Sequence, residues 1–164
     1  MQVRTTVLIP LLALAACTPR QPPPAPAPVP MPAPVVTPEA EAFARSLRAE
    51  AAFEQGIALG RQSRWNEAAD AYRASLTLMP TEPRFHLALA EALLQGGREW
   101  ESADALAAGI RAEEALPSPN HRVLAVDYER LIRLLTRLNR LDEARAAQDR
   151  QNQHRRARDQ APPE

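Results

Sequence analysis

Few side chains in this 164-residue sequence have the types and spacing that chemistry requires. The three histidines, His86, His121 and His154, are far apart in the sequence and lack the spacing of metal ligands. Glu113 and Glu114 are adjacent, so in a helix their side chains point about 100 degrees apart and cannot flank one bond. The sequence contains no GxSxG, HExxH, CxxC or phosphate-loop motif. We therefore expect a protein that is not an enzyme and that uses no cofactor or metal.

Three arginines form the clearest candidate binding pattern. Arg130, Arg133 and Arg137 recur at spacings of three and four, which places them on one face of a helix. Such a stripe can clamp a carboxylate or an acidic peptide. A solvated helix face is the alternative explanation of the same spacing. The formal net charge of the chain is zero, so no bulk electrostatic field favours nucleic acid as a partner.

Cys17 is the only cysteine, so the chain cannot form an intramolecular disulfide. It ends a segment with a positive start at Arg4 and an apolar run over residues 7–16. The run is shorter than the roughly 20 residues that span a bilayer, and this layout is typical of an export signal. Leu14-Ala15-Ala16-Cys17 resembles the lipobox of bacterial lipoproteins. The resemblance implies cleavage before Cys17 and a diacylglyceryl group on its thiol, which would anchor the chain to a membrane. An ordinary secretory signal that contains a cysteine is the alternative.

The resemblance divides the start of the chain into a signal peptide, residues 1–16, and a lipidated cysteine with a proline-rich linker, residues 17–37. Ten of the seventeen prolines lie between residues 18 and 38, a composition that favours a disordered, extended spacer. A docking site for a proline-binding module is the alternative. Thr18 follows the cysteine, where lipoproteins retained at the inner membrane of enterobacteria often carry aspartate. We therefore expect a protein that faces the periplasm, at the outer membrane rather than the inner.

The remainder of the chain must position any binding residues, and its pattern is helical. Residues 65–80 place a set of small and aromatic side chains on one helix face. These are Trp65, Ala68, Ala69, Tyr72, Ser75 and Leu76. Pro80 ends this helix because proline lacks the backbone donor. Just upstream, Gly56 lies within a second helical segment. A glycine there costs about 1 kcal/mol relative to alanine, so we expect it to permit close helix packing.

These two segments resemble one tetratricopeptide repeat (TPR), a family with a period of about 34 residues. The matching positions are Gly56, Leu59, a turn near Ser63, Trp65, Ala68, Tyr72 and Pro80. Matches recur one period later at Ala90, Leu93 and Gly97, and one position beyond a full period at Trp100 and Ala103. The offset predicts a second repeat with one extra residue in its turn, near Arg98 or Glu99. A looser third copy includes Ile132, Leu135, Asn139, Leu141 and Ala144.

The sequence thus predicts an all-α fold, a short TPR-like α-solenoid of about three helical hairpins over residues 38–158. The six helices are expected at about 38–60, 65–79, 81–97, 100–116, 118–138 and from 141 onward. Phe43 and Leu47 are expected to extend the apolar face of the first helix. Ala144 and Ala147 are expected to face inward on the sixth. A disordered tail is expected at 159–164.

In the tetratricopeptide family, the first helices of the repeats line a concave surface that commonly binds extended peptides or a partner's helix. The resemblance places seven residues on this surface, namely Phe53, Ile57, Arg61, Leu87, Glu91, Arg130 and Arg133. Burial of Phe53 and Ile57 against the region of Phe43 is the alternative.

Together these features predict a lipid-anchored scaffold or assembly factor of the bacterial cell envelope that binds a protein or peptide partner. A self-associating structural lipoprotein without a separate peptide ligand is one alternative. An enzyme or small-ligand binder is another, and it would require a closed polar pocket that the sequence does not suggest. No pattern in the sequence selects an oligomeric state, a partner or a pathway.

Overall fold

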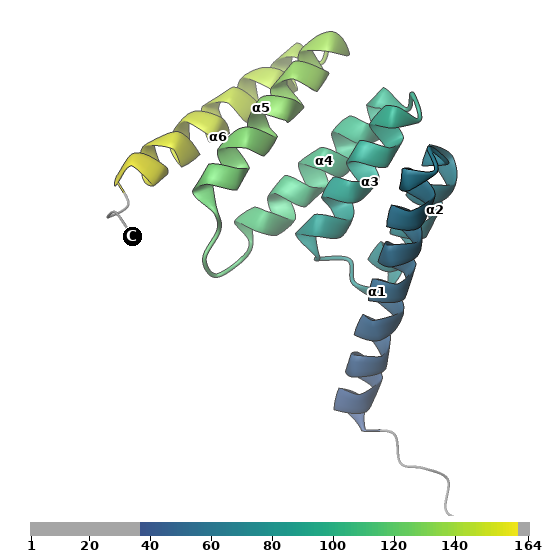
Figure 1. The fold of residues 1–164 in the computed structure, drawn as a ribbon. Coiled ribbons are helices and arrows are strands. Elements are labelled where there is room, and N and C mark those ends of the chain that lie inside the picture. Colours follow the sequence, from purple (N-terminus) through teal and green to yellow (C-terminus); the bar gives the residue numbers. More distant parts are fainter. Residues whose placement is uncertain (1–36, 161–164) are drawn as a thin grey trace, which may run out of the picture. The chain divides into compact units, whose positions relative to one another are not determined.

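The computed structural model describes residues 37–160, which form six helices and no strand (Figure 1). They are α1 (Pro38–Arg61), α2 (Trp65–Leu78), α3 (Pro83–Gln95), α4 (Glu99–Glu114), α5 (His121–Arg137) and α6 (Leu141–Gln160). The all-α class predicted from the sequence is confirmed for this part of the chain. The predicted signal peptide, Cys17, the proline-rich linker up to residue 36 and the end of the tail lie outside the described residues.

The helices pack in sequence order as three hairpins. α1 packs on α2, α3 on α4 and α5 on α6, and the hairpins are joined by contacts of α2 with α3 and of α4 with α5. Local signals set the helix ends. The Thr37 hydroxyl accepts a hydrogen bond from the Ala40 amide at 3.2 Å, and Pro38 occupies the first turn.

Two predicted boundaries differ from the structure. α5 begins at His121, because the Asn120 side chain accepts hydrogen bonds from the amides of Arg122 and Val123, each at 3.1 Å. The sequence pattern had placed this start at Ser118-Pro119. α6 runs to Gln160 and so includes two residues that were assigned to the tail.

The three hairpins share one turn. Ser63, Gly97 and Asn139 have positive φ angles of 58°, 76° and 59°. These are the three turn positions predicted from the sequence, and the prediction is confirmed. In each turn the amide of the following arginine donates a hydrogen bond to the carbonyl oxygen five residues earlier, as in a Schellman motif. The bonds join Arg64 to Leu59 at 3.0 Å, Arg98 to Leu93 at 2.8 Å and Arg140 to Leu135 at 2.9 Å.

The prediction of an extra residue in the second turn is wrong. α4 begins directly after Arg98, as α2 begins directly after Arg64. Each arginine binds the glutamate three residues later, in Arg64–Glu67, Arg98–Glu101 and Arg140–Glu143. The first two pairs are therefore one repeat period apart without an insertion.

Trp100 is consequently not the counterpart of Trp65, although both are tryptophans. The position one repeat period after Trp65 is Glu99. Trp100 is 59% exposed, and the guanidinium of Arg140 lies 5.5 Å from its ring centroid. The buried positions of α2 and α4 follow the same register, and in this register Trp100 lies one position after the equivalent of Trp65.

Small residues let the helices approach closely, as predicted for Gly56. A Cβ atom built on Gly56 would lie only 2.7 Å from Cδ1 of the buried Tyr72. The Phe53 ring packs between Tyr72 and Phe85, with ring centroids 5.4 and 4.9 Å away. The predicted inward positions Ala144 and Ala147 are both buried. The buried cluster continues through all three hairpins along α2, α3, α4, α5 and the first half of α6.

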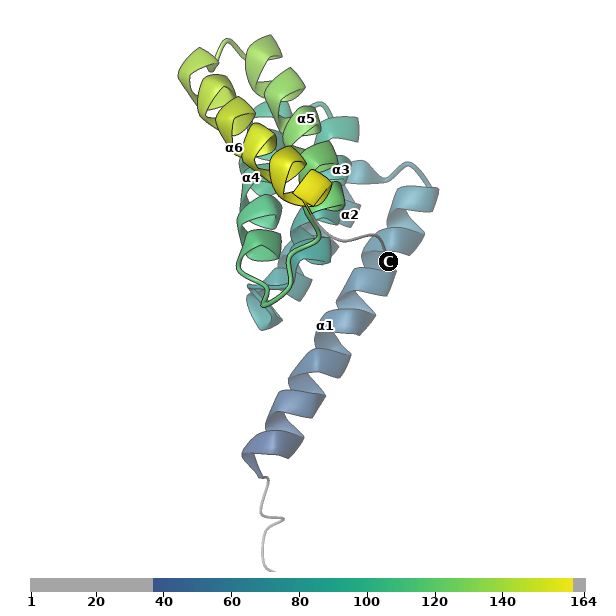
Figure 2. The same ribbon diagram turned by 90° about the vertical axis from the view of Figure 1, so that its left-hand side faces the viewer.

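The first turns of α1 extend past the rest of its hairpin, as both ribbon views show (Figures 1 and 2). α1 has 24 residues and α2 has 14, and α2 ends at Leu78, beside Ala44 and Arg48. Phe43 and Leu47 are accordingly 65% and 54% exposed. The two side chains extend the apolar face of α1, as expected, but in the described residues this part of the face is mostly exposed.

Candidate functional site

A groove of about 240 Å³ lies between α3 and α5, with α4 behind it. We call it the α3–α5 groove. Three leucines from the three helices line it, Leu94, Leu106 and Leu134. Ser102 also faces it, and its hydroxyl donates a hydrogen bond to the Ala90 carbonyl at 2.7 Å, so this buried polar group is satisfied. The groove therefore has an apolar floor of the kind that accepts side chains of a bound segment.

The rim of the α3–α5 groove carries the predicted arginine stripe together with Glu91. Arg130 binds Glu91 of α3 at 2.7 Å, and so joins the first helices of two successive hairpins. Arg137 binds Glu99 at 3.0 Å. Arg133 is the most exposed of the three, at 69%, and its contact is with Glu129 on the same helix at 3.4 Å. Arg133 can therefore exchange its carboxylate partner at the lowest cost, because exposed ion pairs are weak.

Asp127 lies beneath this rim, 3.5 Å from Arg130, with 9% of its side chain exposed. Burial raises the pKa of Asp127, and the charge of Arg130 only partly opposes it. The folded-state pKa thus exceeds the unfolded one. The carboxyl contributes most stability below its unfolded pKa, and this contribution is lost as pH rises through the folded pKa.

We therefore expect Asp127→Asn to raise the free energy of unfolding at neutral pH, because the amide keeps the shape and removes a buried charge. Urea unfolding at several pH values measures it. The gain should shrink as pH falls through the acidic range, where the native Asp127 becomes neutral. Asp149→Asn, a change on the exposed side of α6, is the matched control and should alter stability little. A loss of stability at neutral pH would show that the Arg130 contact outweighs the burial of the charge.

The structure brings together three of the seven residues predicted for the partner surface, Glu91, Arg130 and Arg133. The other four lie elsewhere. Phe53 and Ile57 are half-buried against the central cluster. Leu87 packs on α4, where a Cβ added to Gly109 would lie 2.9 Å from its Cδ2. Arg61 is exposed in the last turn of α1. The predicted alternative for Phe53 also needs correction, since its neighbours are Tyr72 and Phe85 and Phe43 is exposed.

The sequence reasoning missed the leucines that floor the groove. Leu94 lies three residues after Glu91, and Leu134 lies one turn after Arg130, so the helical period carried a signal for both. Leu106 reaches the groove from α4, and no local pattern points to that.

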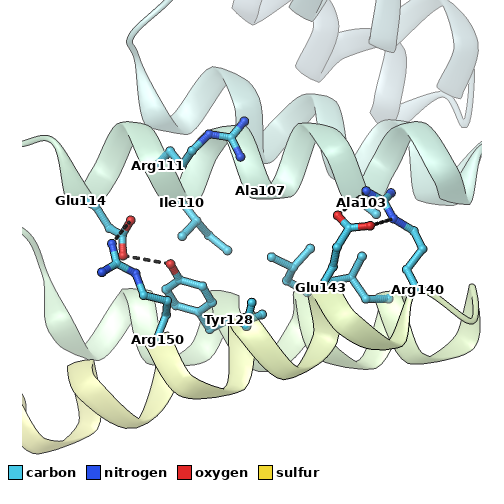
Figure 3. Close-up of a pocket in the computed structure, with 13 residues that line it drawn as sticks. Ala103, Ala107, Ile110, Arg111, Glu114, Tyr128, Arg140, Glu143 and Arg150 are labelled. Atoms are coloured by element: carbon cyan, nitrogen blue, oxygen red, sulfur yellow. Dashed lines mark hydrogen bonds and ion pairs between the residues drawn. The ribbon is translucent and has the colours of Figure 1, made fainter.

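A second pocket, of about 330 Å³, lies between α4 and α6 over α5 (Figure 3). We call it the α4–α6 pocket. Its centre is apolar, with Ile110, Leu131 and Leu135 beneath alanines of both walls. Figure 3 shows ion pairs near both ends, Arg140 with Glu143 and Arg150 with Glu114. Arg111 also lines the pocket, so three arginines and two glutamates surround its apolar centre.

The Glu114 end of this pocket belongs to a polar cluster that the sequence did not reveal. Glu114 Oε1 accepts hydrogen bonds from the Tyr128 hydroxyl at 2.9 Å and from His154 Nε2 at 2.8 Å, and Oε2 pairs with Arg150 at 3.2 Å. Burial raises the pKa of Glu114, but the hydrogen bonds from His154 and Tyr128 and the charge of Arg150 outweigh it. The pKa of Glu114 therefore lies below its usual value.

The two histidines of the cluster touch each other, although the sequence separates them by 33 residues. His121 Nδ1 and His154 Nδ1 are 3.0 Å apart. His154 is 13% exposed, so its side chain is largely buried although the surrounding sequence of α6 is polar. Within residues 37–160, no group of three or more histidine, cysteine or acidic side chains could hold a metal ion.

Comparison of the sequence with protein-family models and with curated proteins finds no match. In the part of the chain that the structure describes, no helix has both the length and the apolar content needed to cross a membrane.

Proposed function

We propose that this protein is a lipid-anchored, periplasm-facing scaffold of the bacterial cell envelope that holds a partner protein. In this proposal the domain is a TPR-like solenoid, and the partner contributes an extended peptide that lies in the α3–α5 groove. The lipid on Cys17 would provide the anchor, at the outer membrane rather than the inner, and the proline-rich linker would hold the domain off the lipid surface.

One observation carries the proposal. The α3–α5 groove joins an apolar floor to a rim on which Arg133 is exposed and only weakly engaged. Apolar floor and basic rim together suit a peptide that offers both an apolar side chain and a carboxylate. The three shared turns and the common register of the first two hairpins support a repeat architecture, and repeat proteins bind through extended surfaces.

The test compares two arginine-to-glutamate substitutions at different sites. We expect Arg133→Glu to weaken partner binding by about tenfold or more, because a carboxylate partner would then meet like charge. Arg145→Glu is the matched control, since Arg145 is 77% exposed and also pairs within its own helix, with Asp142 at 3.1 Å, but lies on α6. A photo-crosslinking amino acid at position 133 or 145 in living cells, followed by mass spectrometry, identifies the partner. Equal adducts at both positions, or none at 133, would contradict the proposal.

Self-association is the second candidate, and the exposed Phe43 and Leu47 favour it. Two copies that pair through α1 would bury both side chains. Analytical ultracentrifugation of the detergent-solubilised chain distinguishes the candidates. If Phe43→Ser with Leu47→Ser converts a dimer to a monomer, self-association holds, and a native monomer at high concentration removes it.

A further inference from the structure

We propose that the second half of α6, residues 150–160, is a cap that acid releases from α4 and α5, because His121 and His154 cannot both be protonated while they remain in contact. Release would uncover the start of α5. This inference concerns a different face from the α3–α5 groove and does not rest on the peptide-binding proposal.

The hydrogen-bond geometry fixes the protonation states that the contact allows. Glu114 Oε1 is a carboxylate oxygen and only accepts, so His154 Nε2 carries a hydrogen and donates it at 2.8 Å. A neutral His154 then has a bare Nδ1, which accepts from Nδ1–H of His121 at 3.0 Å. The neutral pair is therefore satisfied with one hydrogen between the two Nδ1 atoms.

One additional proton preserves this contact and a second destroys it. If His154 becomes imidazolium, it donates through both nitrogens, and His121 accepts at Nδ1. If both rings are imidazolium, two N–H groups face each other across 3.0 Å, and two positive rings stand with centroids 5.2 Å apart. Full protonation of both rings is therefore incompatible with the closed arrangement.

The charges around the pair do not offset a second proton. From α4, Glu114 is already bound by Arg150 and Tyr128, and Glu113 accepts from the Asn120 amide at 3.2 Å. From α6, Arg150 adds positive charge beside the rings. From α5, the phenol of Tyr128 stacks on His154 with centroids 5.6 Å apart and brings no charge. The Glu114 carboxylate would therefore face two imidazolium rings and a guanidinium, while the Glu113 carboxylate is engaged by the Asn120 amide.

This half of α6 depends on polar contacts for its docking. The buried alanines of α6, Ala144 and Ala147, both lie in its first half. Beyond them the one buried side chain is Gln151, whose amide donates to the Ala125 carbonyl at 2.8 Å. The other contacts of residues 150–160 with α4 and α5 include the ion pairs Arg150–Glu114 at 3.2 Å and Arg155–Glu129 at 3.9 Å. Repulsion between the two histidine rings thus acts on a segment with little apolar anchor, whereas the first half of α6 keeps its buried alanines.

The cap covers an apolar face. The cap binds the Ala125 carbonyl through Gln151, and Ala125 of α5 is 6% exposed, while the neighbouring Val123 and Val126 are already 40% and 55% exposed. Release of residues 150–160 would enlarge this patch and open the Glu114 end of the α4–α6 pocket. A fall in pH would in this way expose an apolar surface.

Hydrogen exchange of the full-length protein in detergent tests the inference, with rates corrected for the intrinsic effect of pH. Between about pH 7.5 and about pH 5, we expect protection of residues 150–160 to fall about tenfold or more, while α2 and α3 keep theirs. His121→Asn should abolish the fall, because the amide can donate to or accept from His154 and does not titrate. His86→Asn, on α3, is the matched control and should behave as the native protein.

A second variant keeps the test decisive if His121→Asn does not fold, which circular dichroism reveals. Glu114→Gln retains a hydrogen-bond acceptor and removes the carboxylate that binds His154, so release should occur at higher pH. The inference is overturned if residues 150–160 of the native protein are equally protected at both pH values. It is also overturned if His121→Asn loses protection as the native protein does, or if Glu114→Gln leaves the midpoint of release unchanged.

Discussion

Phe85→Ala is expected to lower the free energy of unfolding by about 3–5 kcal/mol. Phe85 is 0% exposed, its ring centroid lies 4.9 Å from that of Phe53, and the Arg84 guanidinium lies 5.0 Å from its centroid. It sits in the first turn of α3 and contacts α1, so it joins the first hairpin to the second. Truncation leaves a cavity at that junction, which these helices cannot close without shifting as units. Urea unfolding followed by circular dichroism measures the loss.

Phe43→Ala is the matched control because it removes the same atoms from an exposed site. Phe43 is 65% exposed on the extending turns of α1, so its truncation should change stability by less than about 0.5 kcal/mol. A loss at Phe43 comparable to that at Phe85 would show that Phe43 is covered in solution, either by a second copy or by another segment. Equal small losses at both sites would contradict the packing at the junction of the hairpins.

Those features of the fold that local chemistry decides were predictable from the sequence. The turn positions Ser63, Gly97 and Asn139 stood out because glycine, or a small polar residue, must adopt positive φ between two amphipathic segments. The arginine stripe of α5 was visible for the same reason, since spacing along one helix fixes its face. The placement of Glu91 on the same surface was predictable only through the repeat, because Glu91 lies 39 residues from Arg130 on another helix.

The features that depend on packing between helices were not predictable in this way. Trp100 matched Trp65 by residue type, whereas the shared register is the one that the buried positions of α2 and α4 follow, and the pairs Arg64–Glu67 and Arg98–Glu101 lie in the same register. Leu87 was expected on an open surface, but Gly109 lets α4 approach and cover it. A single sequence does not predict such a contact, because the contact depends on how the helices pack.

The polar cluster of Glu114, His121 and His154 shows this dependence on packing most clearly. Glu114, His121 and His154 come from the end of one helix, the start of the next and the second half of the last. Their separations of 33 and 40 residues match no ligand spacing and no helical period. Polar residues on the last helix resemble a solvated face in the sequence. Only the packing of α6 on α5 and α4 turns two of these side chains inward.

Gly56→Ala is expected to destabilise the protein although alanine is the better helix former. In an open helix the change would gain about 1 kcal/mol. Here the added Cβ would lie 2.7 Å from Cδ1 and 2.9 Å from Cζ of Tyr72, a ring that is itself buried. Overpacking of this kind costs typically about 1–3 kcal/mol, so the net result is a loss of stability of up to about 2 kcal/mol. Thermal or urea unfolding measures the sign.

Two further variants isolate the cause. Gly60→Ala, in the same helix, places its Cβ 3.4 Å from Trp65 Cζ3, an ordinary contact, and should be neutral or stabilising. Tyr72→Leu removes the ring, so Gly56→Ala added to it should cost nothing further, and the double-mutant cycle gives the coupling between the two positions. Stabilisation by Gly56→Ala in the native background would mean that Tyr72 moves aside freely. The close approach of α1 and α2 would then not require glycine, and the physical reason for Gly56 in this hairpin would be lost.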